Sequence, residues 1–200
     1  MDILLIGVGV ILVVFYSWYV SLVKRRNQAR EALSSVDVQL RKRHNVLPNV
    51  LKISSKFLQH ETRLLKDLTN LRGEAMASYN IHDPESVSGH LKAESELQAG
   101  MTRFFALAEN YPALTSSETM ITAQHTYSEI EGHISAARRF YNASVTRLNN
   151  AVEIFPGSLI ASLVHVKTMP FFEIVDEAVR QPVDANSHLG SSTASHRKAE

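Results

Sequence analysis

Residues 3–23 read ILLIGVGVILVVFYSWYVSLV, and this apolar stretch without a single charge decides how the rest of the chain is interpreted. At a rise of about 1.5 Å per residue, a helix of this length spans roughly 31 Å, close to the hydrocarbon thickness of a bilayer. Tyr16, Trp18 and Tyr19 lie near its C-terminal end, where amphipathic rings favour the headgroup level. The stretch therefore predicts a transmembrane helix.

The charges on either side of this stretch distinguish an anchor from a signal peptide and predict its orientation. A signal peptide has a basic segment before its apolar run and small residues after it, whereas here Asp2 precedes the run and cations follow it. A buried helix of a soluble protein would need a much larger protein around it. Because Lys and Arg accumulate on the cytoplasmic side, we expect the N-terminus outside and the rest of the chain in the cytoplasm. The juxtamembrane cations are Lys24, Arg25, Arg26 and Arg30.

Apolar residues recur after the anchor at spacings of three and four, which is the pattern of an amphipathic helix. Ten of them fit one heptad register, so we predict one helical seam, and its continuity with the membrane helix stays open. Pro48 lies inside this seam, and because proline lacks a backbone donor and crowds the preceding turn, we expect a kink or an interruption there. The seam comprises Leu33, Val36, Leu40, Leu47, Val50, Phe57, Leu64, Leu68, Leu71 and Ala75.

Two further long helices are predicted, each bounded by turn residues. The second starts between residues 84 and 88 and ends at Tyr111 and Pro112, and the third runs from residues 116–117 to Pro156 and Gly157. Long amphipathic helices with short connections indicate an all-α antiparallel bundle of three long helices, followed by short C-terminal helices at 158–166 and 171–179. The polar, Ser-rich end lacks periodicity, so we expect disorder there. The predicted divisions are a transmembrane anchor at 1–24, a helical bundle at 25–181 and a disordered tail at 182–200.

Charged residues that fall in the apolar seams are the most informative polar positions. The heptad register places Arg43 and Glu61 in the first seam, where burial of a charge is costly unless the charge is paired. Arg138 or Arg139 of the third helix offers a cation for Glu61; alternatively, a small roll of the helix lets one or both seam charges reach solvent. The basic run at residues 41–44 is interpreted as a solvated helix face with one structural arginine.

The sequence contains no motif that predicts catalysis or a metal site. The chain has no cysteine, which excludes disulfides and thiol chemistry, and no glycine-rich phosphate loop or nucleophile elbow. His60 and Glu61 begin like HExxH, but Leu64 takes the place of the second histidine. His125 and His133 share a helix face about 12 Å apart, too far for one ion. We predict a non-enzymatic protein without a cofactor, and an unrecognised hydrolase or metal protein remains the alternative.

Several short motifs occur in the order seen in LemA-family bacterial proteins, and the chain resembles that family from residue 3 to about 179. The most specific motif is DVQLRKRHNVLPN at residues 37–49. Residues 55–57 and 148–149 depart from the usual family pattern, which we interpret as changes in packing. The other motifs are Arg26-Asn27, His60-Glu61, Tyr111-Pro112, AARRFYN at 136–142, Phe155-Pro156 and the block at 169–172.

The resemblance implies a single-pass protein of the bacterial inner membrane with a helical bundle inside, and it implies no established enzymatic activity. Members are loosely linked to envelope maintenance, and one branch to the membranes of magnetosomes. The anchor, the long bundle and the lack of a recognisable catalytic site lead us to expect a scaffold or adaptor that meets lipid through its N-terminal helix and binds a protein partner or itself. With a net charge of +1 we expect no binding to nucleic acid.

The alternative function is a membrane-shaping or lipid-interacting protein that uses the juxtamembrane cations and the C-terminal apolar helices. The polar residues of the family motifs supply no catalytic group, and the resemblance implies an interhelical polar network instead. Its expected members are Asp37, Gln39, Arg43, Asn49, Glu61, Arg138 and Asn142.

Overall fold

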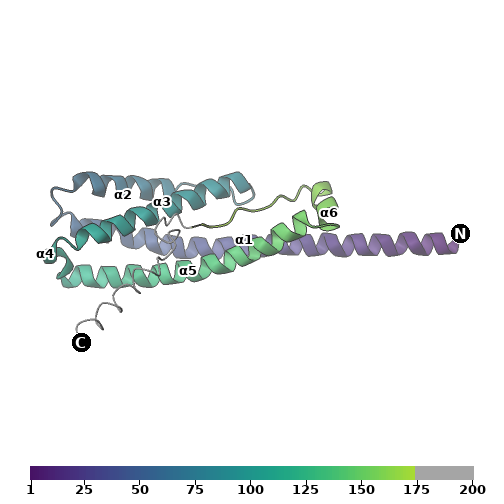
Figure 1. The fold of residues 1–200 in the computed structure, drawn as a ribbon, viewed down its shortest axis with the longest axis horizontal. Helices are drawn as coiled ribbons and strands as arrows, with labels where there is room; N and C mark the ends of the chain where they lie inside the picture. The colour runs from purple at the N-terminus through teal and green to yellow at the C-terminus, as the bar shows by residue number, and fades with distance from the viewer. Residues whose placement is uncertain (174–200) are drawn as a thin grey trace, which may run out of the picture.

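Helix α1, Asp2–Ser54, is the longest element of the computed structural model, which describes residues 1–173. Its first part extends alone from the rest of the molecule, and its second part packs against other helices (Figure 1). The change occurs at Leu22, the first buried apolar residue among the described side chains. Within the described part of the chain, α1 is the one helix that is long and apolar enough to cross a membrane.

The second part of α1 joins a bundle with α2 (Thr62–Ala75), α3 (Pro84–Ala108) and α5 (Glu118–Glu153). Helix α5 runs antiparallel along α1, and α3 runs antiparallel along α2, so the bundle consists of two closely packed pairs (Figure 1). The short helix α4 (Pro112–Thr115) lies at the turn between α3 and α5, and α6 (Gly157–Leu163) packs against α1 and α5 near the anchor. The predicted all-α bundle is confirmed, and residues 1–173 contain no strand.

The buried apolar residues form two clusters that follow each other along the bundle. The cluster nearer the anchor joins α1, α5 and α6 with the first half of α3 and residues 166–172. The distal cluster joins the end of α1 with α2, α3, α4 and the start of α5. Burial of each large aliphatic side chain contributes about 1.5–3 kcal/mol, so these clusters dominate the stability of the bundle. Leu40 belongs to the first cluster and Leu47 to the second, and the buried Arg43 lies between them in α1.

Helix α1 continues through Pro48, so an interruption at this residue is wrong, and the alternative of a kink stays a prediction. Proline has no N–H group to bond the carbonyl of the residue four positions earlier, which here is His44. Arg72 of α2 supplies the missing donor, because its Nε donates a hydrogen bond to the His44 carbonyl oxygen over 3.0 Å. A neighbouring helix thus satisfies the carbonyl that Pro48 leaves free, and α1 continues for six residues beyond it.

The break in the first predicted seam lies after Ser54, where α1 ends and the chain reverses through residues 55–61. The Ser54 hydroxyl donates to the Val50 carbonyl oxygen over 2.8 Å at this end of the helix. Helix α2 then returns beside α1, so the expectation of one seam along one helix is wrong for residues 33–75. Leu47 of α1 and Leu68 of α2 nevertheless share the distal cluster, because the two helices present these residues to the same core.

The remaining helices match the predicted second and third helices. Asp83 caps α3, and its carboxylate accepts a hydrogen bond from the Ser86 N–H over 3.2 Å. Helix α6 corresponds to the short helix predicted at 158–166. After α6 the chain turns at His165, whose φ is 55°, and returns along the bundle as an extended segment, residues 166–173, here called the strap (Figure 1).

Two predictions concern residues beyond the strap. The predicted helix at 171–179 begins in the strap, where residues 171–173 have no regular secondary structure, and its remaining residues lie outside the described part of the chain. The predicted tail at 182–200 lies outside it entirely.

Candidate functional site

Arg43 occupies the centre of a layer of charged side chains between the two apolar clusters. Its Nη1 donates to Oε1 of Glu131 on α5 over 3.1 Å, and its Nη2 donates to the backbone carbonyl oxygen of Glu94 on α3 over 3.1 Å. Nη2 also pairs with the Glu94 carboxylate, and both side chains are fully buried. One arginine therefore connects α1 to both α3 and α5. We call Arg43, His44, Glu94 and Glu131 the polar layer.

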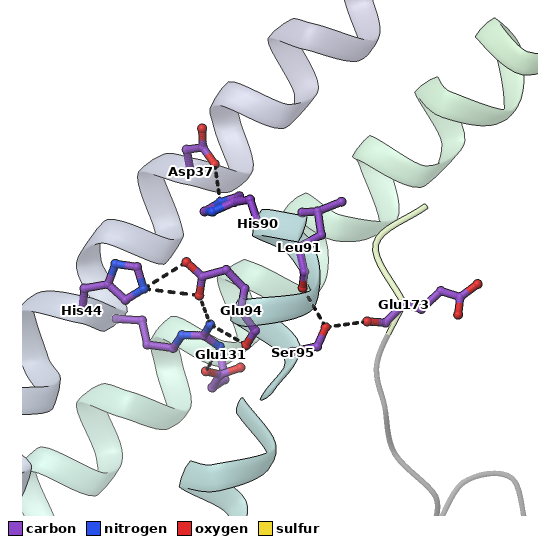
Figure 2. A network of polar contacts seen from close by, with 9 residues as sticks. Asp37, His44, His90, Leu91, Glu94, Ser95, Glu131 and Glu173 are labelled. Carbon is purple, nitrogen blue, oxygen red and sulfur yellow. Dashed lines mark hydrogen bonds and ion pairs between the residues drawn. The ribbon is translucent and has the colours of Figure 1, made fainter. Parts of the chain in front are cut away.

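The charged and polar side chains of this layer contact one another at close range. Nε2 of His44 lies 3.0 and 3.2 Å from the two carboxylate oxygens of Glu94 (Figure 2). Burial lowers the pKa of Arg43, but the carboxylates of Glu94 and Glu131 outweigh it and raise that pKa above its ordinary value. The guanidinium therefore stays charged. Burial, with the charge of Glu131, raises the pKa of the neighbouring Tyr127, which stays neutral.

A second polar cluster lies closer to the anchor and joins α1, the α2–α3 connection and α3. The Tyr79 hydroxyl donates to Oδ2 of Asp37 over 2.6 Å, and Nε2 of His90 lies 3.5 Å from Oδ1 of the same carboxylate. The rings of Tyr79 and His90 stack, with centroids 4.0 Å apart and planes inclined by 9°. Burial, together with the Asp37 carboxylate, raises the pKa of Tyr79. Asp37 therefore holds the connection between α2 and α3 against α1.

A cavity of about 610 Å³ opens between these two clusters. Asp37, His44, His90 and Glu94 line it, together with Arg41 and residues 75–79. Within the described residues, no three His or acidic side chains are arranged to hold a metal ion. The acidic and basic groups are instead engaged with one another, so the arrangement fixes helix positions and leaves a polar recess beside them.

Two asparagines of α5 hold the strap by pairing their side-chain amides with its backbone. Asn142 accepts from the Phe172 N–H over 2.9 Å and donates to the Phe172 carbonyl oxygen over 3.1 Å. Asn149, one heptad further along, pairs in the same way with Met169 over 2.9 and 3.0 Å. The Tyr141 hydroxyl donates to the Pro170 carbonyl oxygen over 2.7 Å between them. The strap is therefore bound to α5 as an extended segment along one helix face.

Five of the seven polar residues predicted as one network make contacts, and these contacts lie at different places in the bundle. Arg43 is in the polar layer, Asp37 holds Tyr79, and Asn142 holds the strap. The Arg138 guanidinium lies 5.9 Å from the Phe172 ring centroid, and Glu61 accepts from the Tyr111 hydroxyl over 3.3 Å instead of meeting an arginine. Gln39 is half-buried and Asn49 is exposed.

The carboxylates that neutralise Arg43 were not predicted from the sequence. Glu94 lies three residues after Leu91 and three before Leu97, at the point where the apolar seam of the second predicted helix has a gap. A charged residue in such a gap was a signal for a partner of Arg43. His44 is also buried, whereas Arg41, three residues earlier in the same basic run, is exposed. Some side chains of this run therefore face the core and others face the solvent.

The juxtamembrane cations lie where α1 enters the bundle. Arg25 donates from Nη1 to the Arg147 carbonyl oxygen of α5 over 3.2 Å, and Lys24 is exposed. Burial, with the nearby charge of Arg26, lowers the pKa of Arg30. The end of α5 therefore meets α1 at the level of these cations.

Comparison with known proteins identifies a family and a relative that this chain resembles in sequence. A family model described as the LemA family matches residues 32–186, which include the polar layer and the strap. The chain is also similar to the magnetosome protein MamQ of Magnetospirillum gryphiswaldense, with 20% identity in an alignment of 174 residues that covers 77% of this chain. The match covers 64% of that relative, so the chain spans less than two thirds of its length.

Proposed function

The chain belongs to the LemA family, and from this membership we propose that it is a non-enzymatic scaffold or adaptor at the bacterial inner membrane. In this proposal α1 crosses the membrane once, the N-terminus lies outside, and the bundle lies in the cytoplasm. The bundle binds another envelope protein or a second copy of itself. The engagement of the buried charges with one another, instead of with an open site, supports a structural role.

The observation that carries the proposal is the continuity of α1. One uninterrupted helix contains both the apolar stretch and Arg43, the residue that connects α1 to α3 and α5. Arg43 follows Val23 by twenty residues, which corresponds to about 30 Å along the helix axis. A partner bound to the bundle would therefore be held at a defined height above the membrane, as a scaffold requires.

The orientation is supported by the cations at one end of the apolar stretch and is tested by labelling. The chain has no cysteine, so single cysteines can be introduced without background. In intact cells, a membrane-impermeant maleimide is expected to label Asp2→Cys directly and Lys167→Cys only after lysis. Labelling of Lys167→Cys in intact cells would reverse the proposed orientation.

The scaffold role is tested by photocrosslinking in native membranes. A photoreactive residue is placed at exposed positions of the bundle surface, such as Ile121 and Phe140 of α5, in the full chain. We expect at least one position to give a defined adduct of constant mass, with a matched position in the anchor, Val13, as the lipid-facing control. A strictly monomeric protein without an adduct from any bundle face would contradict a scaffold role.

A further inference from the structure

Four large apolar side chains are exposed where α5 ends and α6 follows. They belong to Ile154, Phe155, Leu159 and Leu163, and between 61% and 73% of each side chain is exposed. Ile160 and Ala161 of the same short helix are buried against the bundle, so α6 covers the core with one face and presents the other outward. We call the four exposed residues the apolar foot. A patch of this kind, gathered on one element, indicates a contact surface.

The foot lies beside the membrane-facing part of α1. Helix α6 packs against α1 at the point where α1 leaves the bundle (Figure 1). A Cβ atom built on Gly157 would lie 3.7 Å from Cζ3 of Trp18. Trp18 precedes Lys24, the first juxtamembrane cation, by six residues, or about 9 Å along the helix. The foot therefore reaches past the cations toward the membrane.

The antiparallel register of α1 and α5 leads independently to the same level. Arg25 contacts the backbone of Arg147 over 3.2 Å. Seven residues forward along α5 lead to Ile154, and seven residues back along α1 lead to Trp18. The start of the foot is thus level with the aromatic residues of the apolar stretch. The exposed Glu153 precedes the foot, where it is level with Tyr19 and the headgroup region.

We propose that the apolar foot lies in the interface of the same bilayer that α1 crosses, as a second membrane contact beside the anchor. The inference rests on the membrane-spanning role of α1 in the proposed function. Interfacial apolar faces lie at the boundary between headgroups and acyl chains, which is the level that Trp18 and Tyr19 favour near the end of the apolar stretch. Continuity with the anchor identifies lipid as the occupant.

A second copy of the chain is a weaker fit to this surface. Stable protein interfaces use about 20–30 residues on each side, whereas the foot offers four large side chains.

The foot also constrains how the bundle is oriented relative to the membrane. A lone transmembrane helix is free to tilt in any direction, while a membrane contact on one side of it restricts the tilt of the bundle relative to the membrane. The foot would thereby set the orientation in which the bundle meets its partner.

The proposal is tested with the full chain in liposomes of phosphatidylcholine and phosphatidylglycerol. A fluorophore is attached to Leu159→Cys, and its quenching by spin-labelled lipid is compared with quenching by aqueous iodide. Ile121→Cys, another exposed apolar position at the far end of α5, is the matched control. We expect lipid quenching at Leu159 to exceed that at Ile121 by at least about threefold, with iodide quenching reduced.

Equal quenching at the two positions would overturn the proposal, and so would a Leu159 label that is shielded from both quenchers and crosslinks to itself. A label at Val13→Cys within the apolar stretch separates this failure from a failure of the anchor. Lipid quenching at Val13 without lipid quenching at Leu159 would reject the foot alone. Absence of lipid quenching at Val13 would reject the membrane-spanning role on which both proposals depend.

Discussion

Arg43 and Glu94 form an ion pair in which neither side chain has any exposed surface. The pair joins α1 to α3, and Glu131 extends it to α5. Two apolar clusters lie on either side of this contact, and apolar surfaces alone would permit the helices to slide along one another. A buried charge that finds its partner in only one alignment removes that freedom. The polar layer therefore specifies the register of the bundle.

Removal of one member of the pair leaves the other charge buried without a partner. We expect Arg43→Met to lower the free energy of unfolding by about 3–5 kcal/mol, because Glu94 then loses its principal counter-charge. The double variant Arg43→Met, Glu94→Leu should recover most of this loss, since both charges are then absent. Chemical denaturation of the full chain in detergent, followed by circular dichroism, measures both values.

The exposed pair of Lys92 and Glu96 on α3 is the matched control for this measurement. Lys92→Met should change the stability by less than about 0.5 kcal/mol, because solvent screens an exposed pair. An Arg43→Met variant as stable as the natural chain would contradict the register argument.

The hydrogen bond from Arg72 to the His44 carbonyl depends on the missing N–H of Pro48. We expect Arg72→Met to destabilise the natural chain by about 1–3 kcal/mol, because the carbonyl is then left unpaired. In a Pro48→Ala background, the backbone N–H of residue 48 bonds the carbonyl, and the same Arg72 change should cost clearly less. A double-mutant cycle measures the difference, and equal costs in the two backgrounds would disprove the coupling.

The apolar pattern was sufficient to predict the helices and much of the core. Leu33, Leu40 and Leu68 are fully buried as the seam predicts. The break between α1 and α2 was not predictable from periodicity, because the residues before and after the turn at 55–61 fit the same heptad register. Pro48 predicted an interruption at the wrong residue. The Arg72 side chain of α2 bonds the carbonyl that Pro48 leaves free, and no rule based on local sequence includes that contact.

The polar contacts were less accessible from the sequence than the helices. Arg43 was identified as a seam charge, but its partners come from 51 and 88 residues further along the chain, and spacing within one helix carries no information about them. The strap was not predicted from the sequence, for a related reason. Asn142 and Asn149 stand seven residues apart on α5, but an extended segment without periodicity gives no sign that it pairs with them.

The asparagine pairs that hold the strap make a prediction that is local to each residue. Asn142→Leu should accelerate hydrogen exchange of the Phe172 amide by about tenfold or more, because its acceptor is lost and the strap opens there. Asn149→Leu should do the same for Met169. Asn150→Leu, at an exposed position on the same helix, should leave both amides unchanged. Exchange measured by mass spectrometry would refute the assignment if all three variants behave alike.

The buried tyrosines predict a loss of stability at alkaline pH. Burial raises the pKa of Tyr79, Tyr127 and Tyr141 above the ordinary value of 10.0. As the pH rises above 10.0, tyrosines of the unfolded chain lose protons that the folded chain retains, so the free energy of unfolding falls. These three tyrosines should therefore ionise together with unfolding in a spectrophotometric titration. Ionisation of all six tyrosines while the helical signal stays intact would contradict this expectation.

Two glycines on the α5 side of the molecule should respond to alanine in opposite directions. A Cβ atom on Gly157 would lie 2.1 Å from the Ala151 carbonyl oxygen, so Gly157→Ala forces α6 away from α5 and should destabilise the chain by about 1–3 kcal/mol. A Cβ atom on Gly132, inside α5, meets nothing within 4 Å, and Gly132→Ala should stabilise by about 0.5–1 kcal/mol. Thermal unfolding of both variants in the same detergent measures the contrast.

Because α6 carries the apolar foot, Gly157→Ala should also reduce lipid quenching of a label at Leu159, whereas Gly132→Ala should not. A stabilising effect of Gly157→Ala would mean that α6 does not pack against the end of α5 in this way.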